Sequence, residues 1–277
     1  MNLKFVVNDY ILVWNLLFQA SISEKIHAYK QKLWVNYKKQ YNETFKDNAL
    51  ILKDPKNFIP DDDTIYNIVM ESEDYEKVKK STEKFRVELL KTWDENKKTA
   101  LPILKDILRI EMKPYHVLIV DSKLDIIDKT VPKGKKVNTI VWGRKHDDLV
   151  KTMVELVYEI VCKELKNYQK DYKEIVQAVI ELAILNEFHT KISKTSHYLT
   201  GDPSLKYLKR QIYPYWLMYL GATKNEMLNY MMRDKIAFDL DQYTYERQLK
   251  KVDLYTFIDF CIKNQKHIVK INELEII

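Results

Sequence analysis

Glycine is scarce in this sequence: only 4 of the 277 residues are glycine, and proline, with 7, is also below its usual share. Sandwiches, propellers and nucleotide-binding α/β folds need glycine at tight turns and at phosphate loops. No glycine-rich phosphate loop of either common type occurs in the sequence. The scarcity therefore argues against these folds and favours long helices joined by a small number of polar turns.

Cysteine is equally sparse, because only Cys162 and Cys261 occur, and both lie in apolar stretches with a helical pattern. Such thiols are typical of buried free cysteines and do not indicate a disulfide scaffold, so we expect an intracellular, cytoplasmic protein. No pair has the Cys-x-x-Cys spacing of a common structural zinc site. The sequence indicates no cofactor.

A long hydrophobic run is also missing. The apolar stretch Tyr10–Phe18 is too short to span a bilayer and is interrupted by Asn15, so we expect a buried helix there and no membrane partner. The charges are nearly balanced, with 46 Lys and Arg against 40 Asp and Glu and a net charge of +6. Nucleic-acid-binding domains usually concentrate their charge on one face, so this small excess favours a mixed surface.

Apolar residues recur with a helical period along most of the chain, and the sequence predicts a mostly α protein with one small sheet. Pro102 is expected to start or bend a short helix that ends near Arg109. The other helices are expected at about 9–20, 21–41, 64–70, 75–96, 146–167, 171–192, from 203 onward, 227–237 and 253–264.

Residues near several helix starts have capping chemistry. Thr223 and Glu226 have the spacing of a capping box, in which each side chain accepts a backbone N–H from the other residue. Asp171 and Glu174 have the same spacing. Asp202 precedes a proline, which is a strong helix start because the aspartate caps and the proline fills the first helical position.

Two stretches are rich in β-forming residues, Tyr115–Val120 and Val137–Gly143, and the turn Lys133–Lys136 lies between them. We expect them to form a small antiparallel sheet. The chain is expected to have a helical part at 1–112 and a part with the sheet and further helices at 113–277, packed as one compact unit.

Four glutamates lie within otherwise apolar helical turns after the second strand. A carboxylate in such a position is costly unless it is paired, bound to a cation or exposed. Glu155 and Glu159 are four residues apart and share a helix face. Glu181 and Glu187 are six apart and point in different directions, so one of the two is expected to face the first helix.

This order of strand, helix and second helix, from Val137 to Ile192, resembles the core of zinc metallopeptidases of the thermolysin-like class. In that family the first helix bears His-Glu-x-x-His and the second supplies a glutamate ligand. The resemblance implies that Glu155 occupies the catalytic general-base position. It also implies that Glu181 or Glu187 lies near the third-ligand position.

The two histidine positions of that motif are occupied by Val154 and Tyr158. Valine has no lone pair for a metal, and tyrosine ligates only as a phenolate, with an ordinary pKa near ~10. The resemblance therefore implies a degenerate member that kept the fold and lost the metal. An alternative is that the glutamates pair with nearby lysines or arginines in an ordinary helical bundle.

We interpret the chain as a noncatalytic or cryptic zincin-like protein that binds a peptide or protein partner in a cleft between two helices. If it is an enzyme, it is a metallopeptidase-like hydrolase. No metal ligands are assigned. The expected binding residues of the cleft are Tyr158, Glu159, Glu181 and Glu187.

The alternative partner is a nucleic acid, bound by a basic and aromatic helix. Lys206 and Arg210 supply positive charge there, while Tyr213 and Trp216 supply rings. Cations interleaved with aromatic rings can hold phosphates and stack on bases. The same composition also arises in a helix that packs its rings inward, and the apolar residues between them favour that packing.

Overall fold

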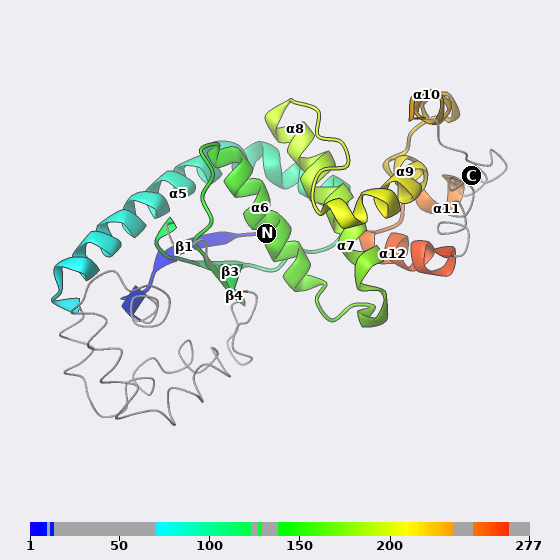
Figure 1. Ribbon diagram of the computed structural model, residues 1–277. Coiled ribbons are helices and arrows are strands. Elements are labelled where there is room, and N and C mark those ends of the chain that lie inside the picture. Colours follow the sequence, from blue (N-terminus) through cyan, green and yellow to red (C-terminus); the bar gives the residue numbers. More distant parts are fainter. Residues whose placement is uncertain (10–11, 14–69, 123–126, 129–137, 235–245, 266–277) are drawn as a thin grey trace. The chain divides into compact units, whose positions relative to one another are not determined.

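The computed structural model describes residues 1–9, 12–13, 70–122, 127–128, 138–234 and 246–265 (Figure 1). Within these residues the protein is mostly helical with one small sheet, which confirms the predicted fold class. Most of the predicted helix 9–20, the predicted helices 21–41 and 64–70, and the turn Lys133–Lys136 lie outside the described residues. No described helix combines the length and apolar character needed to cross a membrane.

The chain divides into two compact units, and each unit is built from two separate segments. Unit 1 comprises Met1–Glu95 and Met112–Thr152, and unit 2 comprises Asn96–Glu111 and Met153–Ile277. This division differs from the expected parts 1–112 and 113–277. It differs because a strand near the N-terminus joins the sheet of unit 1, while residues 96–111 pack with the C-terminal helices.

The sheet belongs to unit 1 and is mainly parallel. Its strands are β1 Leu3–Val7, β2 Tyr115–Ile119, β3 Ile127–Asp128 and β4 Asn138–Trp142, in the spatial order β1-β2-β4-β3. β1 and β4 both run parallel to β2, so that Val117 lies level with Phe5 on one side and Ile140 on the other. The short β3 runs antiparallel to β4.

The predicted antiparallel arrangement is therefore wrong for β2 and β4, although both strands lie where β-forming residues predicted them. Two β-rich stretches around a lysine-glycine turn have the pattern of a hairpin. In the structure the antiparallel neighbour of β4 is β3, and β1 completes the sheet from far away in sequence. Consecutive residues Val117, Leu118 and Ile119 are buried, as is usual for parallel sheets covered on both faces.

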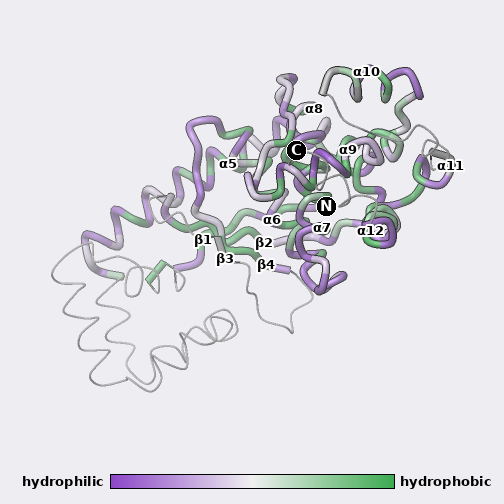
Figure 2. Tube along the Cα trace, turned by 45° about the vertical axis from the view of Figure 1, so that its right-hand side comes forward, coloured by the Kyte–Doolittle hydropathy of each residue, from purple (hydrophilic) through white to green (hydrophobic). Residues whose placement is uncertain are grey.

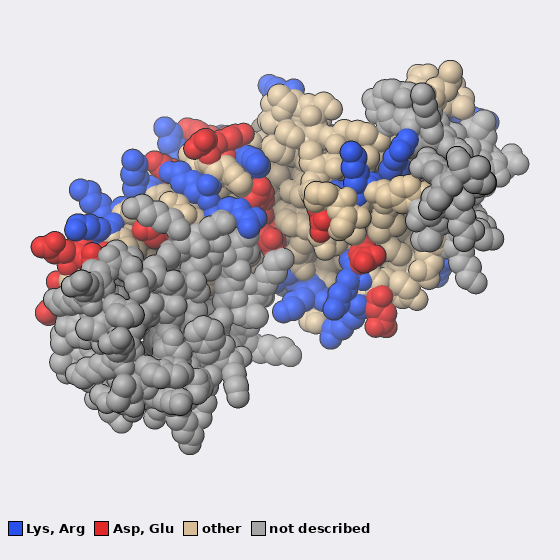
Figure 3. All heavy atoms as spheres, in the orientation of Figure 1, with Lys and Arg blue, Asp and Glu red and all other residues tan. Residues whose placement is uncertain are grey.

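A long helix, α5 (Glu73–Leu108), contributes its first part to unit 1. Its inward residues Tyr75, Phe85, Leu89 and Trp93 are buried. Pro102 lies inside this helix, so it does not start the separate short helix that its position suggested. Residues of both hydropathy classes alternate along α5 (Figure 2), and Lys, Arg, Asp and Glu are mixed on its visible face (Figure 3).

Unit 2 is helical in its described residues. Its α-helices are α6 Leu149–Glu164, which begins at the end of unit 1, α7 Lys173–Glu181, α8 His189–Ser193, α9 Lys206–Leu220, α10 Lys224–Asp234, α11 Glu246–Leu249 and α12 Leu254–Lys263. A π-helix, η4 Leu182–Phe188, joins α7 to α8. Two 3-10 turns, η3 Lys170–Tyr172 and η5 Pro203–Leu205, precede α7 and α9. The predicted helix at 171–192 is therefore an α-helix, a π-helix and a second α-helix in succession. A central aromatic cluster packs α9 on α12, where Trp216 contacts Tyr219 and Phe257.

The capping predictions have mixed outcomes. Glu226 Oε2 accepts the backbone N–H of Thr223 at 2.7 Å, and Thr223 Oγ1 accepts that of Glu226 at 3.3 Å, which confirms the capping box. Asp202 Oδ1 accepts the N–H of Ser204 at 2.9 Å, as predicted for a cap before a proline. The predicted cap at Asp171 is wrong, because α7 begins at Lys173 without a side-chain cap.

Candidate functional site

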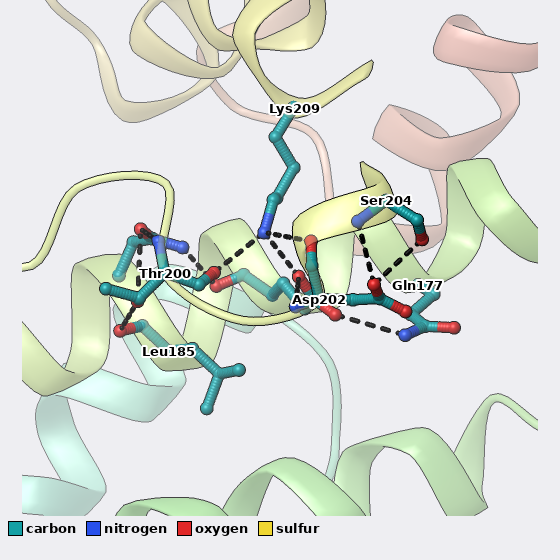
Figure 4. A network of polar contacts seen from close by, with 8 residues as sticks. Gln177, Leu185, Thr200, Asp202, Ser204 and Lys209 are labelled. Atoms are coloured by element: carbon teal, nitrogen blue, oxygen red, sulfur yellow. Dashed lines mark hydrogen bonds and ion pairs between the residues drawn. The ribbon is translucent and has the colours of Figure 1, made fainter. Parts of the chain in front are cut away.

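Glu181, at the end of α7, is buried in unit 2 with both carboxylate oxygens engaged. Its Oε2 accepts from the Nζ of Lys209 at 2.5 Å and from the backbone N–H of Asp202 at 3.1 Å (Figure 4). Its Oε1 accepts from the Nε2 of Gln177 at 3.1 Å. The side chain is 2% exposed, so this carboxylate is held inside the protein, where it accepts three hydrogen bonds.

Lys209 approaches Glu181 from α9 and has no exposed side-chain surface. Besides Glu181, its Nζ donates to the carbonyl oxygens of Thr200 at 2.8 Å and Asp202 at 3.5 Å. A lysine ammonium has three protons to donate, and here each has an acceptor. A buried ion pair is tolerated when it is satisfied in this way, and removing one partner leaves an uncompensated charge.

The loop before α9 is fitted closely against this pair. Gly201 has φ +109°, a conformation that favours glycine, and a Cβ there would lie 2.6 Å from Cδ of Glu181. Asn186, in the π-helix, donates to the carbonyl of Glu181 at 2.7 Å and accepts the N–H of Thr200 at 2.9 Å. The hydroxyl of Thr200 donates to the carbonyl of Leu185 at 2.9 Å. We call these contacts around Lys209 and Glu181 the Lys209 network.

Tyr158, on α6, interacts electrostatically with Glu181 of this network. Glu159 is buried, and Glu155 and Tyr158 are half-buried. Burial, and after it the neighbouring Cys162 thiol and the carboxylates of Glu181 and Glu159, raise the pKa of Tyr158 well above its ordinary value. The structure therefore brings Tyr158 of α6 close enough to Glu181 of α7 for the carboxylate to act on the phenol.

Glu187 has a different environment. Its carboxylate pairs with Lys191 of the next turn at 3.2 Å, and the side chain is partly exposed. Of the two glutamates on the second helix, Glu181 is the one that approaches α6, in keeping with their predicted difference in direction. Among the described residues, no three His, Cys, Asp or Glu side chains are grouped so that they could hold a metal ion.

The basic and aromatic residues of α9 divide between surface and core. Lys206 is exposed, Arg210 and Tyr213 are half-buried, and their spacing places the three on one face of the helix. Trp216 has no exposed surface and stacks on Tyr219. A ring in that position cannot stack on a base, so surface binding by α9 is restricted to the other three residues.

An open groove of about 360 Å³ lies between α9 and α10. Its lining residues are Tyr213, Leu217, Ala222, Glu226, Asn229 and Tyr230. Apolar and aromatic surface dominates this set, and the carboxylate and amide groups come from exposed residues of α10. We call this feature the tyrosine groove.

The rings of the tyrosine groove are held in place by one another. Tyr213 and Tyr230 have ring centroids 4.5 Å apart at an interplanar angle of 41°. Tyr198 packs edge-on against Tyr213 at 5.2 Å, and its hydroxyl is hydrogen-bonded to that of Tyr230. Such contacts restrict the rings before any ligand arrives.

Comparison with known proteins gives no further guide to this site. No protein-family model, curated protein or solved structure matches the chain. The site is therefore interpreted from its own residues and contacts.

Helical periodicity in the sequence is enough to place Lys209 on the apolar face of its helix. Lys209 is spaced with Leu205, Ile212 and Trp216 as one helix face, and all three of those residues are buried. A lysine on an apolar face must find an acidic partner. The identity of that partner, Glu181, cannot be obtained from spacing because the two residues lie on different helices.

Proposed function

We propose that this protein is a noncatalytic binding protein whose tyrosine groove takes a peptide segment of a protein partner. The observation that carries the proposal is the open groove of about 360 Å³ between α9 and α10. Concave sites with apolar linings and a few polar groups are typical ligand sites. Tyrosine side chains give large contact areas at a low cost in conformational entropy.

The cleft predicted between α6 and α7 is replaced by this groove in the proposal. As whole residues Glu159 and Glu181 are 6% and 1% exposed, so their carboxylates have almost no surface with which to contact a partner. The residues lining the tyrosine groove include exposed and half-buried side chains. The proposed partner is still a peptide or protein, but its proposed binding site lies between α9 and α10 instead of between α6 and α7.

The noncatalytic, zincin-like ancestry stays part of the proposal. Val154 and Tyr158 occupy the positions of the ligand histidines, and Glu181 directs its carboxylate at Lys209. In the metallopeptidases a bound cation places positive charge beside the corresponding glutamate. Here the ammonium of Lys209 supplies that charge beside Glu181. This bonding supports a degenerate core, because both oxygens of Glu181 already accept hydrogen bonds, Oε2 from Lys209 and Asp202 and Oε1 from Gln177.

The test is a selection of peptides from a random display library on the full chain, followed by fluorescence anisotropy of the selected peptides. The variant Ala222→Trp fills the groove, and Asn225→Trp adds the same ring to an exposed position of α10 that does not line it. We expect selected peptides to lose at least about tenfold in affinity for Ala222→Trp and to keep it for Asn225→Trp. Equal binding to both variants contradicts the proposal, as does a selection that enriches no peptide.

Single-stranded nucleic acid is the second candidate partner, and the shared face of Lys206, Arg210 and Tyr213 favours it. This candidate predicts binding of labelled DNA or RNA that weakens steeply between about 50 mM and about 200 mM salt. Lys206→Glu should weaken it further, because Lys206 is exposed and its charge is reversed. Absence of binding at the lower salt concentration removes this candidate.

A further inference from the structure

The tyrosine groove combines aromatic surface with an anion. Tyr213 and Tyr230 line it, and their ring faces carry negative potential. An ammonium or guanidinium within about 6 Å of such a ring is attracted to it. Tyr213 is half-buried and Tyr230 is 6% exposed, so the ring that a cation can reach is chiefly that of Tyr213, which Tyr230 supports from behind at 4.5 Å.

Glu226 places a carboxylate at the same groove. Its Oε2 accepts from the backbone N–H of Thr223 at 2.7 Å and from the Thr223 hydroxyl at 2.8 Å, so the capping box fixes the side chain. These bonds, the backbone one first, lower the pKa of Glu226, which therefore stays ionised at neutral pH. Among the described lining residues, Glu226 is the one that carries a charge.

The remaining lining residues suit an aliphatic chain. Leu217 and Ala222 provide apolar surface, and Asn229 provides an amide one helical turn beyond Glu226. Lysine and arginine combine an aliphatic stem with a cationic head, and their stems commonly lie along apolar surface while the heads reach polar groups. An aliphatic side chain would leave the carboxylate without a cation, and an acidic one would be repelled by it.

We infer that the tyrosine groove recognises a lysine or arginine side chain of the partner peptide. The stem lies on Leu217 and Ala222, and the cation lies between the ring of Tyr213 and the carboxylate of Glu226. The inference rests on the proposed function, because it names the chemistry of the segment that the groove takes.

The test uses fluorescein-labelled heptapeptides of glycine and serine whose central residue is lysine, arginine, norleucine or glutamate, titrated with the full chain. Norleucine matches the lysine stem and lacks the charge. We expect the lysine and arginine peptides to bind about tenfold more tightly than the norleucine peptide, and the glutamate peptide to bind most weakly.

Variants then separate the rings from the carboxylate. Tyr213→Phe keeps the aromatic face, and Tyr213→Leu removes it, so only the second should lower affinity for the lysine peptide, by about fivefold. Glu226→Gln should weaken the lysine and arginine peptides and leave the norleucine peptide unchanged. Lys224→Gln, an exposed neighbour on α10, is the charge control. Thermal unfolding of each variant shows that it is folded.

The outcomes distinguish the two proposals. If norleucine binds as tightly as lysine, the inference is overturned, while library peptides that lose binding to Ala222→Trp still uphold the peptide-binding function. If no heptapeptide and no library peptide binds the wild-type chain, both are overturned. A uniform loss of all four heptapeptides in Tyr213→Leu also contradicts a cation-specific role.

Discussion

The helix α9 contributes to two regions with opposite properties, the Lys209 network and the tyrosine groove. On one face Lys209 is buried and donates three hydrogen bonds, and on the adjacent face Tyr213 lines an open groove with the exposed carboxylate of Glu226. The Lys209 network is satisfied internally, so it stabilises the fold and offers nothing to a partner. The tyrosine groove has oriented groups that solvent can reach. Exposure, rather than residue type, therefore separates the structural region from the candidate binding region.

The largest expected effect comes from removing the cation of the Lys209 network. Lys209→Met leaves the carboxylate of Glu181 buried without its partner, and we expect a loss of about 3–5 kcal/mol in the free energy of unfolding. Urea denaturation followed by circular dichroism measures it. The double variant Lys209→Met/Glu181→Leu removes both charges and should recover at least about half of the loss. A single variant as stable as the wild type would show that the pair is not structural.

Gly201 gives a smaller effect in the same region. Gly201→Ala combines a positive φ of +109° with a collision between the new Cβ and the Glu181 carboxylate. We therefore expect the free energy of unfolding to fall by about 3 kcal/mol. Gly221→Ala is the matched control, because φ there is +89° and the nearest atom, Cε of Lys250, is at an ordinary 3.5 Å. The free energy of unfolding of Gly221→Ala should fall by about 1 kcal/mol, because only the backbone conformation is unfavourable there. Equal losses in urea denaturation would mean that the loop moves away from Glu181 at little cost.

The smallest effect is a pH dependence in the groove region. The folded pKa of Glu226 is lowered by the bonds from Thr223, so its contribution to stability is present above the unfolded pKa and is lost as pH falls through the folded value. Urea midpoints of wild type and Glu226→Gln should therefore differ at neutral pH and converge below the ordinary glutamate pKa of about 4.3. A difference that stays constant with pH would show that ionisation of Glu226 does not support α10.

Local features of the fold were predictable from sequence. The helices after α5, the strands β2 and β4, and the capping box of Thr223 and Glu226 depend on residues close to one another in the chain. The parallel pairing of β2 with β4 was not predicted, because the two-residue strand β3 reverses the chain between them, and β1 joins β2 from across the whole of α5. A short run such as Leu3–Val7 has no turn signal linking it to Tyr115.

The candidate site was predictable only in part. Carboxylates in apolar turns drew attention to Glu181 and Glu187, and the structure places the first in a buried pair with Lys209 and the second in a partly exposed pair with Lys191. The partner of Glu181 was missed, because Lys209 lies on a different helix and spacing within one helix cannot identify it. The tyrosine groove was missed as well, since it depends on how α10 packs beside α9.

The π-helical stretch Leu182–Phe188 restricts how this chain can change in length. A π-helix bonds each N–H to the carbonyl five residues back, so deletion of one residue here would return the stretch to α-helical bonding and shift its residues relative to their neighbours. Asn186 would then leave the position from which it holds Thr200. Related chains that retain the buried lysine are expected to vary in residue type within this stretch and to admit neither insertions nor deletions there.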